Sequence, residues 1–117
     1  MSYVDGFIAA VPTANREKFK KHAEIAAAIF KENGALSLAE CWGEDVPEGK
    51  VTSFPMAVKL KEDETVVFGW IIWPDKATRN AGMEKMMKDP RTQPDVSPIP
   101  FDGQRMVFGG FELLVKA

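Results

Sequence analysis

The segment Tyr3–Val11, YVDGFIAAV, reads as a buried β-strand, and yet it has an aspartate, Asp5, near its middle. Aromatic, branched and small residues make up the rest of the segment, and Pro12 follows it. Successive side chains of a strand point to opposite faces of its sheet. Since both faces of this strand are largely apolar, we expect both to be covered, and we expect Asp5 to have a polar partner.

The remaining elements alternate along the chain. Apolar residues at helical spacing predict a helix over 14–33, which Thr13 can cap and which Gly34 ends. Asp75 caps a second predicted helix, which runs to Lys88. The other strands are predicted over 35–42, 65–73 and 104–115, with loops over 43–53 and 90–100, while 54–60 suits either a helical turn or an edge strand.

The order strand, helix, strand, strand, helix, strand predicts an α+β fold of the ferredoxin-like βαββαβ type. Such a chain forms a four-stranded antiparallel sheet with two helices on one face. A length of 117 residues fits one domain, so we expect residues 1–117 to form a single ferredoxin-like domain.

Composition argues against several classes of protein. The net charge of −2 and the scattered lysines and arginines argue against a nucleic-acid partner. No apolar run approaches the roughly 18 residues of a membrane span, and the first residues lack the pattern of a signal peptide. The single cysteine, Cys41, cannot form an internal disulfide, so we expect a cytoplasmic protein. With acidic and aromatic neighbours, Cys41 is predicted to be a buried structural thiol.

The sheet face without helices is also expected to be apolar. We assign the small and aliphatic residues Val4, Gly6, Ile8, Ala10, Val67, Gly69 and Ile71 to the helix side, because they suit close packing. The opposite face then carries Tyr3, Phe7, Phe68, Trp70 and Ile72. A soluble monomer rarely exposes an apolar face of this size. We therefore predict a homodimer, a dimeric α/β barrel in which two sheets pack face to face.

On this assignment Asp5 lies between the two sheets. It either pairs with a basic group such as Arg105, makes a hydrogen bond at the interface, or anchors a small molecule. The predicted ligand-binding residues are Tyr3, Asp5, Phe7, Phe68, Trp70 and Arg105. Glu40 of the second strand could join Asp5 in an acid–base pair of catalytic carboxylates, although both residues are equally explained as edge residues that meet water.

Several stretches closely resemble the YbaA-like family of functionally uncharacterised bacterial proteins. They are YVDGF at 3–7, ECW at 40–42, DVPEGKVTSF at 45–54, ETVVFGWI at 64–71, DPR at 89–91 and PFDGQRMVFGGF at 100–111. This resemblance covers nearly the whole chain in order, and it implies membership of the dimeric α/β-barrel superfamily. The superfamily includes cofactor-independent monooxygenases, haem-dependent chlorite dismutases, small lactone isomerases and stress-response proteins, so the resemblance implies no particular activity.

Two classes of function stay open from the sequence. In the first, the homodimer binds a small apolar or cyclic molecule between or beside the sheets, with cofactor-independent oxygenation or isomerisation as its chemistry if it is an enzyme. In the second, the aromatic residues fill the barrel of a non-catalytic structural or stress-related homodimer. No cofactor and no metal are expected, because the only histidine, His22, sits on the first helix, away from the barrel, and no second ligand lies at metal-binding spacing.

Overall fold

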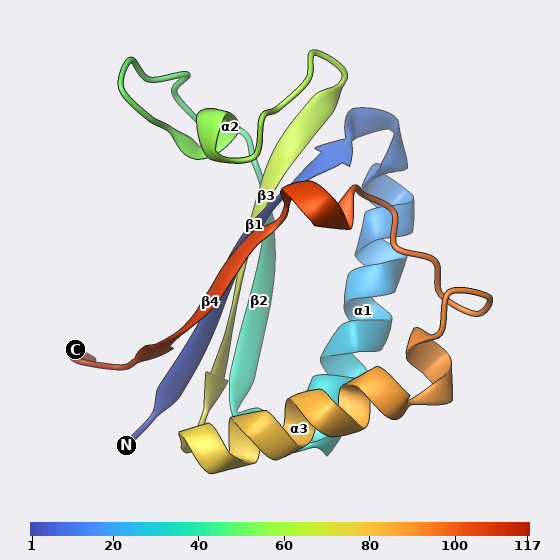
Figure 1. Cartoon of the computed structure of the whole chain (residues 1–117), viewed down its shortest axis with the longest axis vertical. Helices are drawn as coiled ribbons and strands as arrows, with labels where there is room; N and C mark the ends of the chain where they lie inside the picture. The colour runs from blue at the N-terminus through green and yellow to red at the C-terminus, as the bar shows by residue number, and fades with distance from the viewer.

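The computed structural model describes residues 1–117, which fold around one four-stranded sheet (Figure 1). The strands are β1 (Tyr3–Pro12), β2 (Ser37–Trp42), β3 (Glu64–Trp73) and β4 (Val107–Glu112), in the order β2-β3-β1-β4. Every neighbouring pair is antiparallel. Helices α1 (Arg16–Glu32) and α3 (Lys76–Lys88) cover one face, here called the helix face. This topology confirms the predicted ferredoxin-like fold.

The opposite side of the sheet, here called the open face, is covered at one end only. There the short helix α2 (Phe54–Ala57) and its flanking loops pack on the sheet (Figure 1), in a cluster built on Ala10, Val58 and Val66. This result decides between the two structures considered for residues 54–60. The Ser53 side chain accepts a hydrogen bond from the Met56 amide at 3.1 Å, and that N-cap favours a helical turn over a strand.

Several element ends differ from the expectation, most clearly at the start of α1 and at both ends of the last strand. Thr13 does not cap α1, because its hydroxyl instead lies 2.8 Å from the hydroxyl of Thr65, and a 3-10 turn over Thr13–Asn15 leads into the helix. The last strand runs over Val107–Glu112 and not over 104–115, because Gly103–Arg105 form a 3-10 turn and pairing with β1 ends at Glu112. Gly34 does end α1 with a left-handed backbone, at φ 104°.

The register between β1 and β3 decides which side chains meet the helices. Phe7 lies opposite Gly69, and its ring occupies the space where a Cβ on Gly69 would stand. Residues directly opposite each other in an antiparallel pair point to the same face. Ala9 and Val67, next along this face, are buried in one cluster with Phe19 of α1. The face that carries Phe7 and Gly69 is therefore the helix face.

The predicted faces of β1 were consequently wrong, whereas those of β3 are confirmed. Tyr3, Asp5, Phe7 and Ala9 point toward the helices, and Val4, Gly6, Ile8 and Ala10 point to the open face. Apart from Asp5, the side chains on both faces of β1 are apolar or small. Residue size alone therefore led to the wrong assignment of the two faces. The decisive factor is the fit of a large ring over a glycine on the neighbouring strand.

Asp5 lies in the helix face and joins three elements of the fold. Trp73 at the end of β3 donates its indole N–H to Asp5 Oδ2 at 3.0 Å. Arg79 of α3 donates from Nη2 to Oδ1 at 2.9 Å and from Nε at 3.1 Å to both oxygens. The Arg79 guanidinium also stacks on the Tyr3 ring, 5.0 Å from its centroid. The Asp5 side chain is thus an internal polar link, and the expected pairing with Arg105 is wrong.

The segment between α3 and β4 holds α1 from outside the sheet. Ser97 Oγ lies 3.1 Å from Nδ1 of His22, the Arg91 guanidinium makes a two-bond ion pair with Glu32, and Phe101 packs edge-on against Phe19. Burial lowers the pKa of His22, which favours the neutral ring in this contact. The segment therefore has a structural role as a strap over α1.

None of the helices combines the length and the hydropathy needed to cross a membrane.

Replacing Asp5 by alanine should destabilise the fold strongly. The Asp5→Ala variant leaves the Arg79 charge and the Trp73 N–H without their acceptor, and breaking a buried ion pair costs about 3 kcal/mol. Urea unfolding followed by circular dichroism measures the loss. The exposed carboxylate Asp95 provides the control, because Asp95→Ala removes the same charge without a buried contact and should change the unfolding free energy by less than about 0.5 kcal/mol. Equal, small effects of the two variants would contradict a structural role for Asp5.

Candidate functional site

A groove of about 380 Å³ runs between helix α1 and the edge strand β2 on the helix face. Its floor comes from the alternating residues Leu38, Glu40 and Trp42 of β2, and one wall comes from α1. We call it the α1–β2 groove. Because β2 is an edge strand, no further strand closes the outer side of the groove. The site is therefore open to small molecules from solvent.

The wall of the groove combines apolar and cationic side chains. Phe19 packs against Trp42 with ring centroids 6.1 Å apart, and the Arg16 guanidinium lies over the Trp42 ring at 5.6 Å. Lys20 and Glu24 follow Arg16 at successive helical turns and line the same groove. A ring-shaped ligand would meet aromatic surface at this end, with positive charge beside it.

Glu40 is the group in the groove with the most unusual environment. It lies between Leu38 and Trp42 on its strand face, opposite Gly69 of β3. Burial alone raises its pKa to about 7, since no basic side chain and no hydrogen-bond donor of the protein stabilises the carboxylate. A carboxyl group with such a pKa can either accept or donate a proton near neutral pH.

The two carboxylates considered from sequence do not form a catalytic pair. Asp5 and Glu40 both point to the helix face, but Asp5 lies opposite Ile71 whereas Glu40 lies opposite Gly69. Both oxygens of Asp5 are already bound by Arg79 and Trp73. Of these two carboxylates only Glu40 is free of partners, so Glu40 alone is the candidate acid–base group.

The remaining predicted site residues lie on different surfaces. Tyr3 and Phe7 point to the helix face, whereas Phe68 and Trp70 point to the open face. They therefore cannot line one cavity in the protomer.

Arg105 lies apart from both groups and makes a two-bond ion pair with Glu64 at 2.6 and 2.8 Å. It also donates to Asp102 Oδ2 at 3.0 Å. The bonds from Arg105 lower the pKa of Glu64 to about 2, so Glu64 stays ionised at neutral pH. This ion pair links the start of β3 to the chain before β4, which gives Arg105 a structural role.

Cys41 is the neighbour of Glu40, and its side chain points to the other face of the sheet. The thiol is exposed and free, so the expectation of a buried structural cysteine is wrong. The reason is that β2 lies at the edge of the sheet and its open face has only partial cover. Cys41 contributes instead to an apolar hollow on the open face, beside Phe54 and Phe68.

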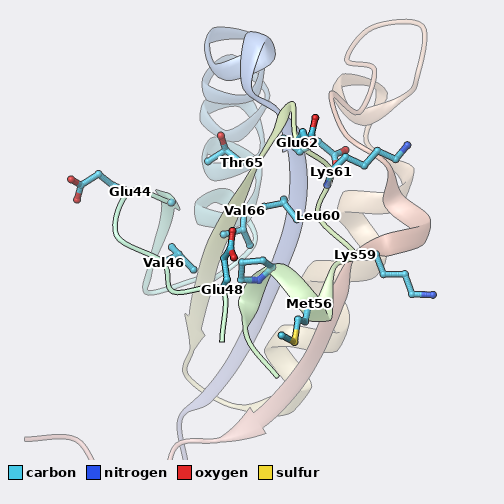
Figure 2. A pocket seen from close by; sticks show the side chains of 13 residues that line it. Glu44, Val46, Glu48, Met56, Lys59, Leu60, Lys61, Glu62, Thr65 and Val66 are labelled. Atoms are coloured by element: carbon cyan, nitrogen blue, oxygen red, sulfur yellow. The ribbon is translucent and has the colours of Figure 1, made fainter. Parts of the chain in front are cut away.

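A hollow of about 610 Å³ lies beside α2 and is here called the α2 hollow. Figure 2 shows Glu44 and Lys59 pointing outward on opposite sides of it, away from its centre. Its lining is mixed in charge, and no cluster of three or more His, Cys, Asp or Glu side chains in residues 1–117 is arranged for a metal ion. Glu64 of this lining is already bound by Arg105, so we place the candidate site in the α1–β2 groove.

Comparison with known proteins gives a family and a fold. A family model described as "Protein of unknown function (DUF1428)" matches residues 2–103. The uncharacterized proteins YbaA of Escherichia coli and of Shigella flexneri are each 52% identical to the chain over 115 residues, which is 98% of both chains.

Two solved structures share the fold at low sequence identity. A dimeric ferredoxin-like protein from an uncultured marine organism has a TM-score of 0.59 at 15% identity and covers 98% of this chain and 96% of its own. SnoaB, a cofactor-independent oxygenase from Streptomyces nogalater, has a TM-score of 0.50 at 14% identity and covers 98% and 93%. Both likenesses support the ferredoxin-like fold alone.

The raised pKa of Glu40 predicts how protein stability depends on pH. Between the pKa of an unfolded glutamate, 4.5, and about 7, the folded state holds a proton that the unfolded chain releases. The free energy of unfolding should therefore fall as pH rises through this range. Glu40→Gln should remove that fall and stabilise the protein at pH 8 by roughly 1 kcal/mol or more.

The measurement is urea unfolding at pH 5 and pH 8, together with an NMR titration of the Glu40 carboxyl carbon. Glu24→Gln is the matched control, since it removes the same charge from the exposed wall of the groove and should not reproduce the gain. A Glu40 titration midpoint near 4.5 would show that the carboxylate is well solvated and would remove the basis of the site.

Proposed function

The chain belongs to the DUF1428 family of proteins of unknown function, and we propose that it is a cytoplasmic homodimer that binds a small apolar or cyclic molecule in the α1–β2 groove. Glu40 would exchange a proton with the bound molecule. The apolar walls of the groove and its few polar groups support this proposal, since small-molecule sites have that composition.

One observation carries the proposal: Glu40 is a half-buried carboxyl group in an apolar groove, with no hydrogen-bond or ion-pair partner in the protein. A buried carboxylate normally has an ion pair or hydrogen bonds, as Asp5 does here. An unpaired one costs stability, and groups of this kind concentrate at functional sites. A ligand with an O–H or acidic C–H would supply the missing partner.

The chemistry open to the site is proton transfer. The Glu40 carboxylate would take a proton from an acidic O–H or C–H of the ligand and would later return it to the same or another atom. Arg16 and Lys20 would stabilise the negative charge that forms on the ligand. Isomerisation needs these steps alone, and a cofactor-independent oxygenation would begin with the same deprotonation. The fold that the chain shares with SnoaB is compatible with either.

The assembly is proposed from the open face of the sheet. Phe68 of β3 is 44% exposed there, and Phe111 and Val107 of β4 are exposed on the same face. Pairing two such faces would remove this apolar surface from water. The similar ferredoxin-like protein from a marine organism is dimeric, which agrees with the proposal. The free thiol of Cys41 agrees with a reducing compartment.

A second candidate is a non-catalytic homodimer whose barrel is filled by side chains. The aromatic pair Phe54 and Phe68, with ring centroids 6.1 Å apart, favours this alternative because it already occupies part of the open face. The two candidates share the dimer and differ in the groove. A filled structural dimer requires no ligand at Glu40.

Ligand binding can be tested with a matched pair of ring compounds, 2-naphthol and naphthalene. We expect amide NMR shifts on addition of 2-naphthol to cluster at 16–27 and 38–42, which line the groove. Glu40→Gln should weaken 2-naphthol binding about tenfold, the effect of losing a hydrogen bond to a charged group, and leave naphthalene binding unchanged. Glu24→Gln should bind both compounds like the parent protein. Shifts spread over the open face, or an equal effect on both compounds, would contradict a site at Glu40.

The dimer can be tested by two phenylalanine variants on opposite faces. Phe68→Glu places a charge in the proposed interface and should raise the dimer dissociation constant at least a hundredfold, because a charge would be buried without a partner. Phe108 is 75% exposed on the helix face of β4 and is the control, so Phe108→Glu should leave the mass of the assembly unchanged. Analytical ultracentrifugation and native mass spectrometry measure both. A monomeric parent protein would contradict the assembly.

A further inference from the structure

The segment after β4, residues 113–117, is apolar up to Val115 and has the composition of a strand, and yet its residues beyond Leu113 have no strand partner in the protomer. We call it the C-terminal arm. Leu114 and Val115 are 88% and 83% exposed. The last backbone bond of the β4 region is donated by the Leu113 amide to the Ser2 carbonyl at 3.1 Å, and pairing stops there. Two large aliphatic side chains in adjacent positions are thus left in water, which is costly.

Two neighbouring hollows on the α2 side of the sheet form a surface that matches the arm. The first, about 270 Å³, is lined almost entirely by apolar side chains and includes Cys41, Phe54 and Phe68. It shares lining residues with the α2 hollow, which bears the carboxylates of Glu44 and Glu48. The apolar hollow is thus contiguous with the α2 hollow, in which Figure 2 labels the acidic side chains of Glu44 and Glu48.

We propose that the arm of one protomer docks on its partner, with Leu114 and Val115 in the apolar hollow and Lys116 beside Glu44 and Glu48. The order of residues in the arm, two aliphatic side chains and then a lysine, matches the apolar hollow and the neighbouring loop that carries Glu44 and Glu48, whereas Lys59 lies on the opposite side of the α2 hollow from Glu44. The occupant is therefore a second copy of the chain. This inference rests on the face-to-face homodimer proposed above.

The placement of the arm supports docking in trans. Figure 1 shows the chain after β4 leaving on the side of the sheet away from α1 and α3, at the end of the strands opposite to α2. Val115 follows Glu112, the last residue of β4, by three positions, so it reaches at most about 11 Å beyond the strand, less than the length of the sheet's ten-residue strands, and it cannot turn back to α2 of its own chain. In a two-fold dimer with strands running in opposite directions, each arm lies against the α2 end of the partner.

Docking of the arm would connect the dimer to the α1–β2 groove. Trp42 lines both the apolar hollow and the groove, and Cys41 and Glu40 are adjacent residues of β2 that point to opposite faces. The arm would brace an edge strand that otherwise has a free side. The partner chain would thus hold the strand that positions Glu40.

Cys41, the only cysteine of the chain, provides a direct test. Leu114→Cys places a second thiol on the arm, and oxidation by oxygen with copper phenanthroline joins two thiols into one disulfide while the oxygen is reduced. We expect covalent dimers, with a mass of two chains, on a non-reducing gel, and loss of these dimers in the double variant Leu114→Cys, Cys41→Ala. Val51→Cys is the matched control, since Val51 is 96% exposed in the loop before α2 and should give few dimers.

Deletion of residues 113–117 tests the contribution of the arm to the assembly. We expect the dimer dissociation constant to rise at least tenfold, and we expect Lys116→Glu to weaken the dimer while the added change Glu48→Lys restores it. A stable dimer whose Leu114→Cys variant forms no cross-link to Cys41, with an unchanged dissociation constant after deletion, would overturn the arm proposal alone. A cross-link within one chain would overturn it as well. A parent protein that is monomeric would overturn the proposed assembly and the arm together.

Discussion

The Asp5–Arg79 ion pair is the interaction on which the arrangement of the helix face depends. A carboxylate inside a central strand must meet donors, and Arg79 of α3 and Trp73 of β3 supply them. This fixes the phase of β1, because a shift by one residue would turn Asp5 to the open face and every apolar partner with it. Trp73, which donates to Asp5, also lies against Gly82 of α3. The contacts of Asp5 therefore also fix how α3 crosses the sheet. One polar contact therefore specifies the position of two elements.

Asp5 and Glu40 point to the same face of the sheet and differ in their surroundings. Asp5 is saturated by donors and is part of the fold. Glu40, on the edge strand, has apolar neighbours and no donor, and burial raises its pKa to about 7. The fold would be more stable with a neutral side chain at this position. A residue that lowers stability in this way is best explained by a partner that comes from outside the chain.

The order of elements follows from the sequence because it depends on local patterns. Helical spacing, the cap at Asp75 and the glycine after α1 predict the βαββαβ order, and the order of elements then implies the sheet. The faces of β1 could not be predicted in the same way, because both of its faces are apolar. They are set by contacts far apart in sequence: Phe7 over Gly69, and Asp5 with Arg79, 74 residues away. At the candidate site, Glu40 was recognisable from its alternation with Leu38 and Trp42. The groove, the stacked Arg16 and the exposed thiol of Cys41 depend on how α1 and the edge strand lie in space.

Strand β2 contributes residues both to the proposed dimer interface and to the proposed proton-transfer site. Its helix face carries Glu40 and its open face carries Cys41, so a contact on one face is separated from the groove by the strand alone. An edge strand with one paired side is the least constrained strand of a sheet, and proton transfer requires a carboxyl group held in a fixed position. The protomer leaves the open face at this end with an apolar hollow and leaves two aliphatic side chains of the arm in water. A single event, the pairing of two copies, would cover both surfaces and would make the strand that holds Glu40 rigid. If both proposals hold, dimerisation would complete the site as well as cover an apolar face.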